Sequence, residues 1–202
     1  MNLSIWTLLL PMVAYLIGGI PVGLLLVRWT TRLDVRQTGS GNIGTTNVWR
    51  VAGMGVALAT LSGDILKGAL PCLATLHLVD HGPAYPASVG VAAVLGHMFP
   101  IYLGFRTGGK GVATAAGMFG VLTPLACGLA LAVFFLSAVI SRRVSVGSLV
   151  GALALPVLIV LTSGDLYLAG AGTLVMLLMM LRHRDNIQRL RKGEEPEFKG
   201  KR

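Results

Sequence analysis

Charged residues are scarce in this chain of 202 residues: Asp, Glu, Lys and Arg make up only 12%, whereas soluble domains carry about 25%. So few charged groups cannot cover the surface of a soluble globular protein, and 54% of the residues are hydrophobic. The composition therefore excludes a disordered chain, a collagen-like chain and an ordinary cytosolic enzyme. What remains is a protein with several membrane-spanning segments.

Alternating ten-residue segments, the pattern of a membrane β-barrel, are also missing. The chain instead has continuous apolar runs rich in Leu, Ala, Val and Gly. Only helices and closed barrels satisfy all their backbone hydrogen bonds in lipid. The predicted fold class is therefore all-α, a polytopic bundle of transmembrane helices forming a single domain of residues 1–202.

Cysteine and acidic residues are few. Cys72 and Cys127 lie in apolar runs, which favours packed thiols over a disulfide or a metal site. His77 and His81 are four residues apart but lack a third ligand, so we expect no metal and no cofactor. The net charge of +9 is typical of basic cytoplasmic loops in a membrane protein, and we expect no nucleic-acid partner.

The apolar runs and the basic residues together predict the topology. The runs cover residues 4–27, 52–79, 84–104, 112–140, 146–162 and 166–181. A single crossing by residues 112–140 would place Arg142 and Arg143 outside the cell, against the positive-inside rule. Two short crossings with a turn at Thr123 and Pro124 remove this conflict. We therefore predict seven crossings, with an external N-terminus, a cytoplasmic C-terminus and an uncleaved helix over residues 1–27.

This topology places every polar, glycine-rich loop on the cytoplasmic face. The loops lie near residues 28–50, 105–114 and 142–148, with a basic tail over 182–202. Chemistry gathered at one interface favours an enzyme acting there, because a transporter more often has its site near the bilayer midplane. A transporter of small phosphate esters remains the alternative.

Loop one, residues 33–50, contains glycines at the spacing of a dinucleotide-binding fingerprint. That fingerprint requires a preceding strand, which a membrane helix bundle does not offer. The glycines can still direct backbone N–H groups at an anion in front of a helix N-terminus. The residues of this loop predicted to bind substrate are Gly41, Asn42, Gly44, Thr46 and Asn47, and Ser40, Thr45 and Arg50 supply further donors. A polar turn with left-handed Asn and Gly residues remains open.

Loop two, residues 105–114, is one residue short of a nucleotide-binding P-loop. Gly111 stands where that motif has the Ser or Thr that binds Mg²⁺, so a nucleotide site is not expected. Gly108, Gly109, Lys110 and Gly111 instead predict a loop that binds phosphate. His97, inside the preceding apolar run, is expected to be packed and hydrogen-bonded.

Two further pairs of polar residues have helical spacing. Asp64 and Lys67 are three residues apart in an apolar run, and we favour a structural ion pair over a functional site. His183 and Asn186 are also three apart, at the start of the basic tail. Because they share a helix face at the interface, a polar site is favoured over a tail that only contacts anionic lipid.

These segments together resemble the acyl-phosphate-dependent glycerol-3-phosphate acyltransferases of bacterial membranes. The matching stretches, in the expected order, are residues 39–50, 64–68, 96–114, 143–148 and 183–195. The resemblance implies seven helices with an external N-terminus, in the inner membrane, with the active site on the cytoplasmic face. It also implies acyl transfer from acyl phosphate to the 1-hydroxyl of sn-glycerol 3-phosphate, giving lysophosphatidic acid in the first step of phospholipid synthesis.

The resemblance also assigns residues. It implies catalytic roles for Ser40, Arg50, Lys110, His183 and Asn186. It places Ser145 and Ser148 at the border of the site and gives Glu195 a structural role. The implied partners are acyl phosphate, glycerol 3-phosphate and membrane lipid; no protein partner is implied, and a monomer would suffice.

The residue inventory agrees with this chemistry. Two phosphate-bearing substrates need two anion sites, and two glycine-rich loops are present. Acyl phosphate is a mixed anhydride that is already activated, and no Ser–His–Asp or Cys–His set is evident in the sequence. Positioning and charge stabilisation would then supply the catalysis. The proton of the attacking hydroxyl could go to a substrate phosphate oxygen or to His183.

Overall fold

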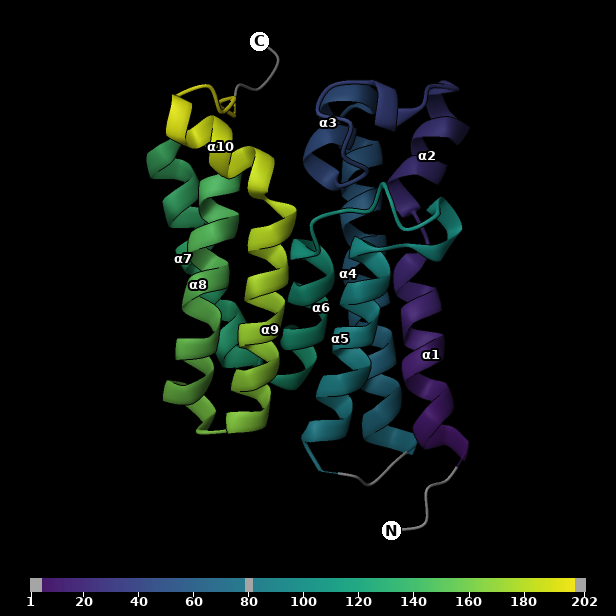
Figure 1. The fold of residues 1–202 in the computed structure, drawn as a ribbon, viewed down its shortest axis with the longest axis vertical. Helices are drawn as coiled ribbons and strands as arrows, with labels where there is room; N and C mark the ends of the chain where they lie inside the picture. Colours follow the sequence, from purple (N-terminus) through teal and green to yellow (C-terminus); the bar gives the residue numbers. More distant parts are fainter. Residues whose placement is uncertain (1–4, 79–81, 199–202) are drawn as a thin grey trace. The chain divides into compact units, whose positions relative to one another are not determined.

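The computed structural model describes residues 5–78 and 82–198, and every regular element in these ranges is helical (Figure 1). The all-α fold class is thus confirmed. Residues 1–4, 79–81 and 199–202, including His81 and the end of the basic tail, lie outside the described ranges.

The helices form two compact units, residues 1–122 and residues 123–202. The first unit contains α1 (Ile5–Gly19), α2 (Val22–Thr31), η1 (Val35–Gln37), α3 (Thr45–Ala52), α4 (Met54–Leu78), α5 (Ala84–Met98), η2 (Ile101–Leu103) and α6 (Val112–Leu122). The second contains α7 (Pro124–Ser141), α8 (Val144–Ser163), α9 (Leu166–Arg182) and α10 (Arg184–Lys192).

The predicted break inside residues 112–140 is confirmed. Helix α6 ends at Leu122, and α7 begins at Pro124 after the non-helical Thr123. Proline suits the first position of a helix because its missing N–H would have no partner there. It also disfavours a helical conformation for the residue before it, which favours the end of α6 at this point.

The spanning helix predicted over residues 1–27 corresponds to one candidate span, Leu9–Thr31, but the helix is interrupted within it. Helix α1 ends at Gly19, and α2 starts at Val22 and runs on to Thr31. Pro21 explains the break, because its ring disfavours a helical Ile20 and it cannot donate a backbone hydrogen bond. The Ile20 carbonyl accepts a hydrogen bond from the Lys67 ammonium instead, at 3.1 Å.

Glycines allow close helix packing in the first unit. A Cβ on Gly68 would lie 2.0 Å from the Thr114 carbonyl oxygen, and one on Gly117 would lie 2.0 Å from that of Ile65. These two contacts join α4 to α6 backbone to backbone. Gly18 and Gly96 bring α1 and α5 equally close. Small residues at helix interfaces are typical of membrane proteins, where packing rather than water exclusion drives association.

Within residues 5–78 and 82–198, five segments are long and apolar enough to cross a membrane. They are Leu9–Thr31, Met54–His77, Ala84–Leu103, Pro124–Ser141 and Val144–Ser163. A sixth results if α9 and α10, which meet at a bend of 60°, count as one. Helix α6 is shorter, with 11 residues.

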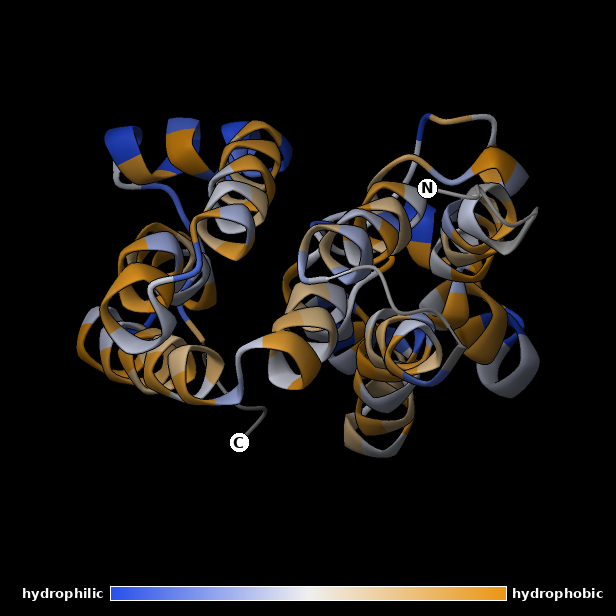
Figure 2. Ribbon diagram, turned by 90° about the horizontal axis from the view of Figure 1, so that it is seen from below, coloured by the Kyte–Doolittle hydropathy of each residue, from blue (hydrophilic) through white to orange (hydrophobic). Residues whose placement is uncertain are grey.

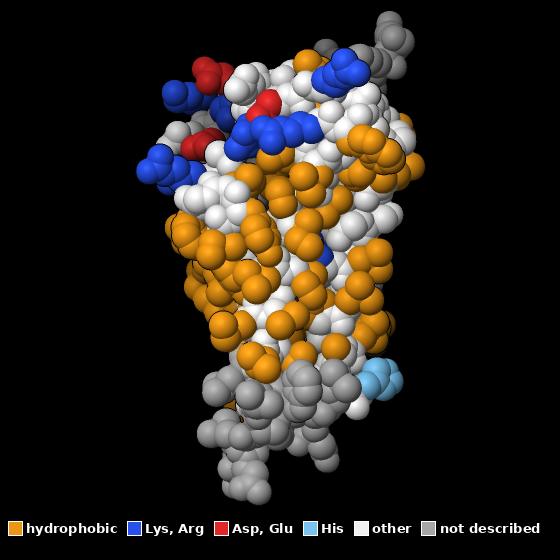
Figure 3. Space-filling model, turned by 90° about the vertical axis from the view of Figure 1, so that its right-hand side faces the viewer, with side chains coloured by type: hydrophobic (Ala, Val, Ile, Leu, Met, Phe, Trp, Pro, Cys, Tyr) orange, Lys and Arg blue, Asp and Glu red, His pale blue; other side chains and the backbone are white. Residues whose placement is uncertain are grey.

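Hydrophobic residues dominate the long helices, as Figure 2 shows. On the face drawn in Figure 3 their side chains form a broad band, and Lys and Arg gather at one end of it. Many exposed side chains on these helices are large and apolar, such as Met12 and Leu25 in the first span and Leu161 in α8. An apolar band bounded by basic residues is the surface that a lipid bilayer requires.

Candidate active site

Asn47 holds loop one in shape. Its buried side-chain amide donates to the backbone carbonyls of Val35, Thr38 and Asn42 at 3.0–3.1 Å. Its Oδ1 accepts from the Ser40 backbone N–H at 2.9 Å. One side chain thus ties four points of the loop to the first turn of α3.

Two glycines of loop one have the left-handed backbone expected of a polar turn. Gly39 has φ +64° and Gly41 has φ +69°. A Cβ at Gly39 would also lie 2.3 Å from Oδ1 of Asn47. Gly44 precedes α3, and its N–H is held by Oδ1 of Asn42 at 2.8 Å. The turn geometry and the anion-binding interpretation are compatible, since the turn leaves α3 starting with unpaired N–H groups.

Three predicted site residues of loop one have polar side-chain groups that are available to bind a ligand. The hydroxyls of Ser40 and Thr46 and the guanidinium of Arg50 have no hydrogen-bond or ion-pair partner within the described parts of the chain. Ser40 and Arg50 are also exposed. A fixed loop that carries unused donors is suited to binding an anion.

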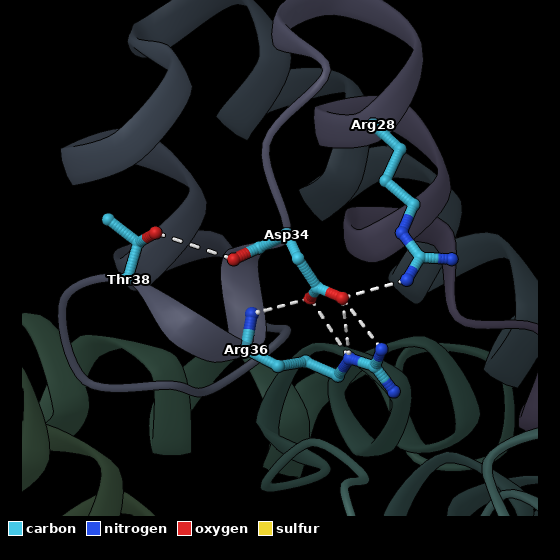
Figure 4. Close-up of polar contacts among 4 residues, drawn as sticks. All are labelled: Arg28, Asp34, Arg36 and Thr38. Carbon is cyan, nitrogen blue, oxygen red and sulfur yellow. Dashed lines mark hydrogen bonds and ion pairs between the residues drawn. The ribbon is translucent and has the colours of Figure 1, made fainter.

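The start of loop one is fixed by a carboxylate between two arginines (Figure 4). Asp34 Oδ2 lies 2.7 Å from Nη2 of Arg28 and 2.6 Å from Nη2 of Arg36. Asp34 also caps η1 by accepting from the Arg36 backbone N–H. The hydrogen bonds from Arg36, with a smaller contribution from Arg28, hold the pKa of Asp34 well below its usual range. Our sequence reasoning did not single out Asp34, although a lone acid among arginines was a visible signal.

Loop two lies against the last turn of α5. The Gly109 N–H donates to the His97 carbonyl at 3.0 Å. A Cβ on Gly108 would lie 2.1 Å from the Met98 carbonyl oxygen, and one on Gly109 would lie 2.0 Å from Nε2 of His97. These glycines are therefore required for packing, whatever they also bind. Lys110 follows directly and is half-buried.

The predicted ion pair between Asp64 and Lys67 is confirmed. Their Oδ1 and Nζ atoms lie 2.8 Å apart, and both side chains are buried. The buried position expected for His97 is also confirmed, and its Nδ1 lies 3.7 Å from Oδ1 of Asp64.

A hydrophobic cluster joins loop one to η2, the short helix that precedes loop two. Its buried members are Leu24, Val27, Val35, Ile43, Val48 and Ala57. Leu103 of η2 packs against this cluster. Loop one and the helix that leads towards loop two are therefore supported by the same cluster.

In the second unit, Glu195 organises the site candidates. Its Oε1 accepts from the Asn186 amide at 2.6 Å, and its Oε2 accepts from Nε of Arg189 at 2.8 Å. Burial alone would raise the pKa of Glu195. The contacts from Ser145, Asn186 and Arg189 outweigh burial, so the pKa is lowered. The Ser145 hydroxyl lies near Glu195 without the geometry of a hydrogen bond. Ser145, Asn186 and Glu195 are thus brought together. The Ser148 hydroxyl donates to the Val144 carbonyl within its own helix.

His183 lies at the junction of α9 and α10 and is buried. Its Nδ1 is 2.8 Å from the Met179 carbonyl oxygen. Because a carbonyl only accepts, Nδ1 must carry the hydrogen, and Nε2 of the neutral ring is then an acceptor. This is the tautomer that a proton acceptor at Nε2 needs.

Two contacts that the sequence did not suggest hold the segment after α10. Nε of Arg143 donates to the Glu195 carbonyl at 3.1 Å, and the Phe198 N–H donates to the Arg142 carbonyl at 2.7 Å. They tie this segment to the turn between α7 and α8. Pairings over such distances along the chain leave no local pattern.

Metal ligands do not cluster in residues 5–78 and 82–198: no group of three His, Cys, Asp or Glu side chains there could hold an ion. Cys72 and Cys127 are buried thiols. His77 is exposed, and its predicted neighbour His81 lies outside the described ranges.

Comparison with known proteins decides the family. The family model described as glycerol-3-phosphate acyltransferase matches residues 8–193. The chain belongs to the glycerol-3-phosphate acyltransferase family. Among glycerol-3-phosphate acyltransferases, it is 50% identical to that of Syntrophotalea carbinolica, over 92% of this chain and 94% of the relative. It is 46% identical to that of Geobacter sulfurreducens, over 95% and 97%.

Solved structures of PlsY agree. PlsY is described as an integral membrane glycerol 3-phosphate acyltransferase, and its glycerol 3-phosphate form matches with a TM-score of 0.90, 32% identity and 96% coverage of both chains. Its lysophosphatidic acid form matches with a TM-score of 0.88 and 31% identity, over 96% of this chain and 95% of that one. The protein is thus a PlsY-family acyltransferase of lipid biosynthesis and an integral membrane protein.

Proposed function

We propose that the protein transfers a fatty acyl group from acyl phosphate to the 1-hydroxyl of sn-glycerol 3-phosphate. The products are lysophosphatidic acid and inorganic phosphate, in the first step of bacterial phospholipid synthesis. The observation that carries the proposal is loop one, where Asn47 fixes the backbone while Ser40 and Arg50 keep unused, exposed donors. PlsY binds glycerol 3-phosphate and lysophosphatidic acid, which supports the same substrate and product here.

In the proposed reaction, the substrate hydroxyl attacks the acyl carbonyl carbon. A C–O ester bond forms, the anhydride C–O bond breaks, and phosphate leaves with the electron pair. Arg50 and Lys110 hold phosphate oxygens, and the backbone N–H groups of Thr45 and Thr46 at the start of α3 add donors. The hydroxyl proton passes to a phosphate oxygen or to Nε2 of His183, and we propose that Asn186, Ser145 and Ser148 take part in the same reaction.

We further propose seven crossings, with α6 as one short crossing. The N-terminus is then external, and loop one, loop two, the α7–α8 turn and the C-terminal segment are cytoplasmic. The arginines of these segments support this orientation, since basic residues gather on the cytoplasmic side. The whole chain acts as one acyltransferase domain in the inner membrane, a monomer suffices, and no cofactor takes part.

The test is an assay of the purified protein in detergent with labelled glycerol 3-phosphate and either palmitoyl phosphate or palmitoyl-CoA. We expect labelled lysophosphatidic acid only with the acyl phosphate, and one phosphate released for each ester formed. Product from palmitoyl-CoA alone would overturn the proposed donor. Uptake of glycerol 3-phosphate into sealed vesicles without any acyl donor would favour the transporter instead.

A further inference from the structure

Three ionisable side chains meet inside the first unit, away from the exposed donors of loop one. Asp64 and Lys67 come from α4 and His97 from the last turn of α5, and all three are at most 5% exposed. An ion pair buried among helices is seldom the most stable solution, because hydrophobic residues of similar volume often stabilise as well or better. Ionisable residues within membrane spans are accordingly candidates for a role beyond packing.

On one side, the cluster supports the approach to loop one. Nζ of Lys67 donates to the Ile20 carbonyl at the break between α1 and α2. Helix α2 then leads directly into loop one and packs closely against it. A Cβ on Gly23 would lie 2.1 Å from the Ile43 carbonyl oxygen.

On the other side, the cluster contacts loop two. Residue 97 holds Gly109 twice: its carbonyl accepts the Gly109 N–H, and its ring lies where a Cβ on Gly109 would be. The next residue is Lys110. The backbone that presents the Lys110 ammonium is therefore set by the position of the imidazole ring.

We propose that His97 is a positioning residue for Lys110, because its imidazole ring fixes the position of the loop-two backbone. In this proposal Asp64 orients the ring, and Lys67 balances the charge of Asp64. Oδ1 of Asp64 lies 3.7 Å from Nδ1 of His97, which is longer than a hydrogen bond. At this distance the carboxylate acts on the ring through its charge rather than through a hydrogen bond, and both side chains are buried.

This inference rests on the proposed function, in which Lys110 binds phosphate. If His97 acts through Lys110, its effect must vanish when the lysine side chain is absent. A residue that only stabilises the fold would instead lower activity by the same factor in both backgrounds.

The experiment is a double-mutant cycle of His97→Ala and Lys110→Ala, measured as kcat/KM for glycerol 3-phosphate and for acyl phosphate. We expect His97→Ala to lower kcat/KM for one of the two about tenfold in the wild-type background and less than twofold beside Lys110→Ala. Equal factors in both backgrounds, or full activity of His97→Ala, would overturn the inference. An inactive wild-type protein would instead count against the proposed function.

Two variants keep the test decisive. His97→Gln repeats the cycle with a longer polar side chain, so that poor folding of His97→Ala does not determine the result. The matched control is Thr75→Val, which alters another buried polar side chain of α4, bonded only within its own helix to the Cys72 carbonyl. We expect Thr75→Val to lower the melting temperature at most slightly and to leave kcat/KM unchanged in both backgrounds.

The role of Asp64 is tested with both charges of the pair removed together. Asp64→Asn with Lys67→Met leaves no buried ion alone, so the fold is spared the largest penalty. The double variant should lower the same kcat/KM as His97→Ala, and the loss should again disappear beside Lys110→Ala. A loss that persists beside Lys110→Ala would remove Asp64 from the proposal.

Discussion

Loop one and the segment around α10 both carry predicted site residues, but they use them differently. In loop one, Asn47 makes the structural contacts, and Arg50 is exposed and without a partner in the described ranges. Around α10, His183 and Asn186 are buried and already bonded to Met179 and Glu195. In the proposed function, structure and binding are thus separate tasks in loop one, whereas around α10 the same side chains would serve both. Substitutions should therefore separate activity from stability only in the first region.

The substitution expected to separate activity from stability most clearly is Arg50→Ala. Because the guanidinium makes no hydrogen bond or ion pair within the described residues, we expect an unchanged melting temperature. We expect kcat/KM to fall roughly 30- to 150-fold, since a charged contact to a dianionic phosphate is lost. Arg50→Lys should restore only part of the activity, because an ammonium lacks the planar fork. Steady-state kinetics with a parallel melting curve check this, and a large drop in melting temperature would remove the distinction.

Asn47→Ala should show the opposite balance. It leaves the carbonyls of Val35, Thr38 and Asn42 without their shared donor, and we expect a loss of about 2 kcal/mol in stability. Activity should fall about tenfold because the loop loses its shape. Thermal unfolding and kinetics measure the two effects. A variant with normal stability and low activity would show that Asn47 contacts substrate directly.

Much of this fold follows from the sequence because charge and apolar length are local signals. The positions of Arg142 and Arg143 predicted that residues 112–140 must be divided, and the break at Thr123 confirms it. The spacing of Asp64 and Lys67 likewise predicted their pairing, since helix geometry fixes which neighbours meet.

What the sequence did not predict depends on contacts between distant segments. The Lys67 ammonium donates to the carbonyl of Ile20, 47 positions earlier in the chain. The sequence around Lys67 does not indicate that the helix of the first span is interrupted at Ile20. The Gly-Ile-Pro signal at residues 19–21 was visible, but the hydropathy of the run masked it. Asn47 was recognised as a polar donor, whereas its structural role depends on how the loop closes around it.

Glu195→Gln tests whether stability and site geometry are coupled around α10. The Gln amide keeps the shape of the side chain but lacks the negative charge that Asn186 and Arg189 bind. We therefore expect a loss of roughly 1–2 kcal/mol in the free energy of unfolding. Activity should fall several-fold as well. The folded-state pKa of Glu195 is lowered, so its stabilisation is present above the unfolded value of about 4.3 and is lost as the pH falls through the folded-state pKa. Glu195→Gln should therefore be less sensitive to acid than the wild type, as melting curves from pH 7 down to about pH 3 would show.

The smallest effect should come from Arg191→Ala, which lies on α10 only five residues after Asn186. Arg191 is exposed, and within the described ranges it makes no hydrogen bond or ion pair. It carries the same charge as Arg50 but faces water or lipid headgroups, where a single cation is well solvated and contributes little. We expect kcat/KM within about twofold of the wild type and an unchanged melting temperature. If Arg191→Ala and Arg50→Ala lowered activity equally at equal expression, general basicity rather than a defined phosphate site would explain both. The proposed difference between a phosphate-binding arginine in loop one and a solvated arginine on α10 would then be wrong.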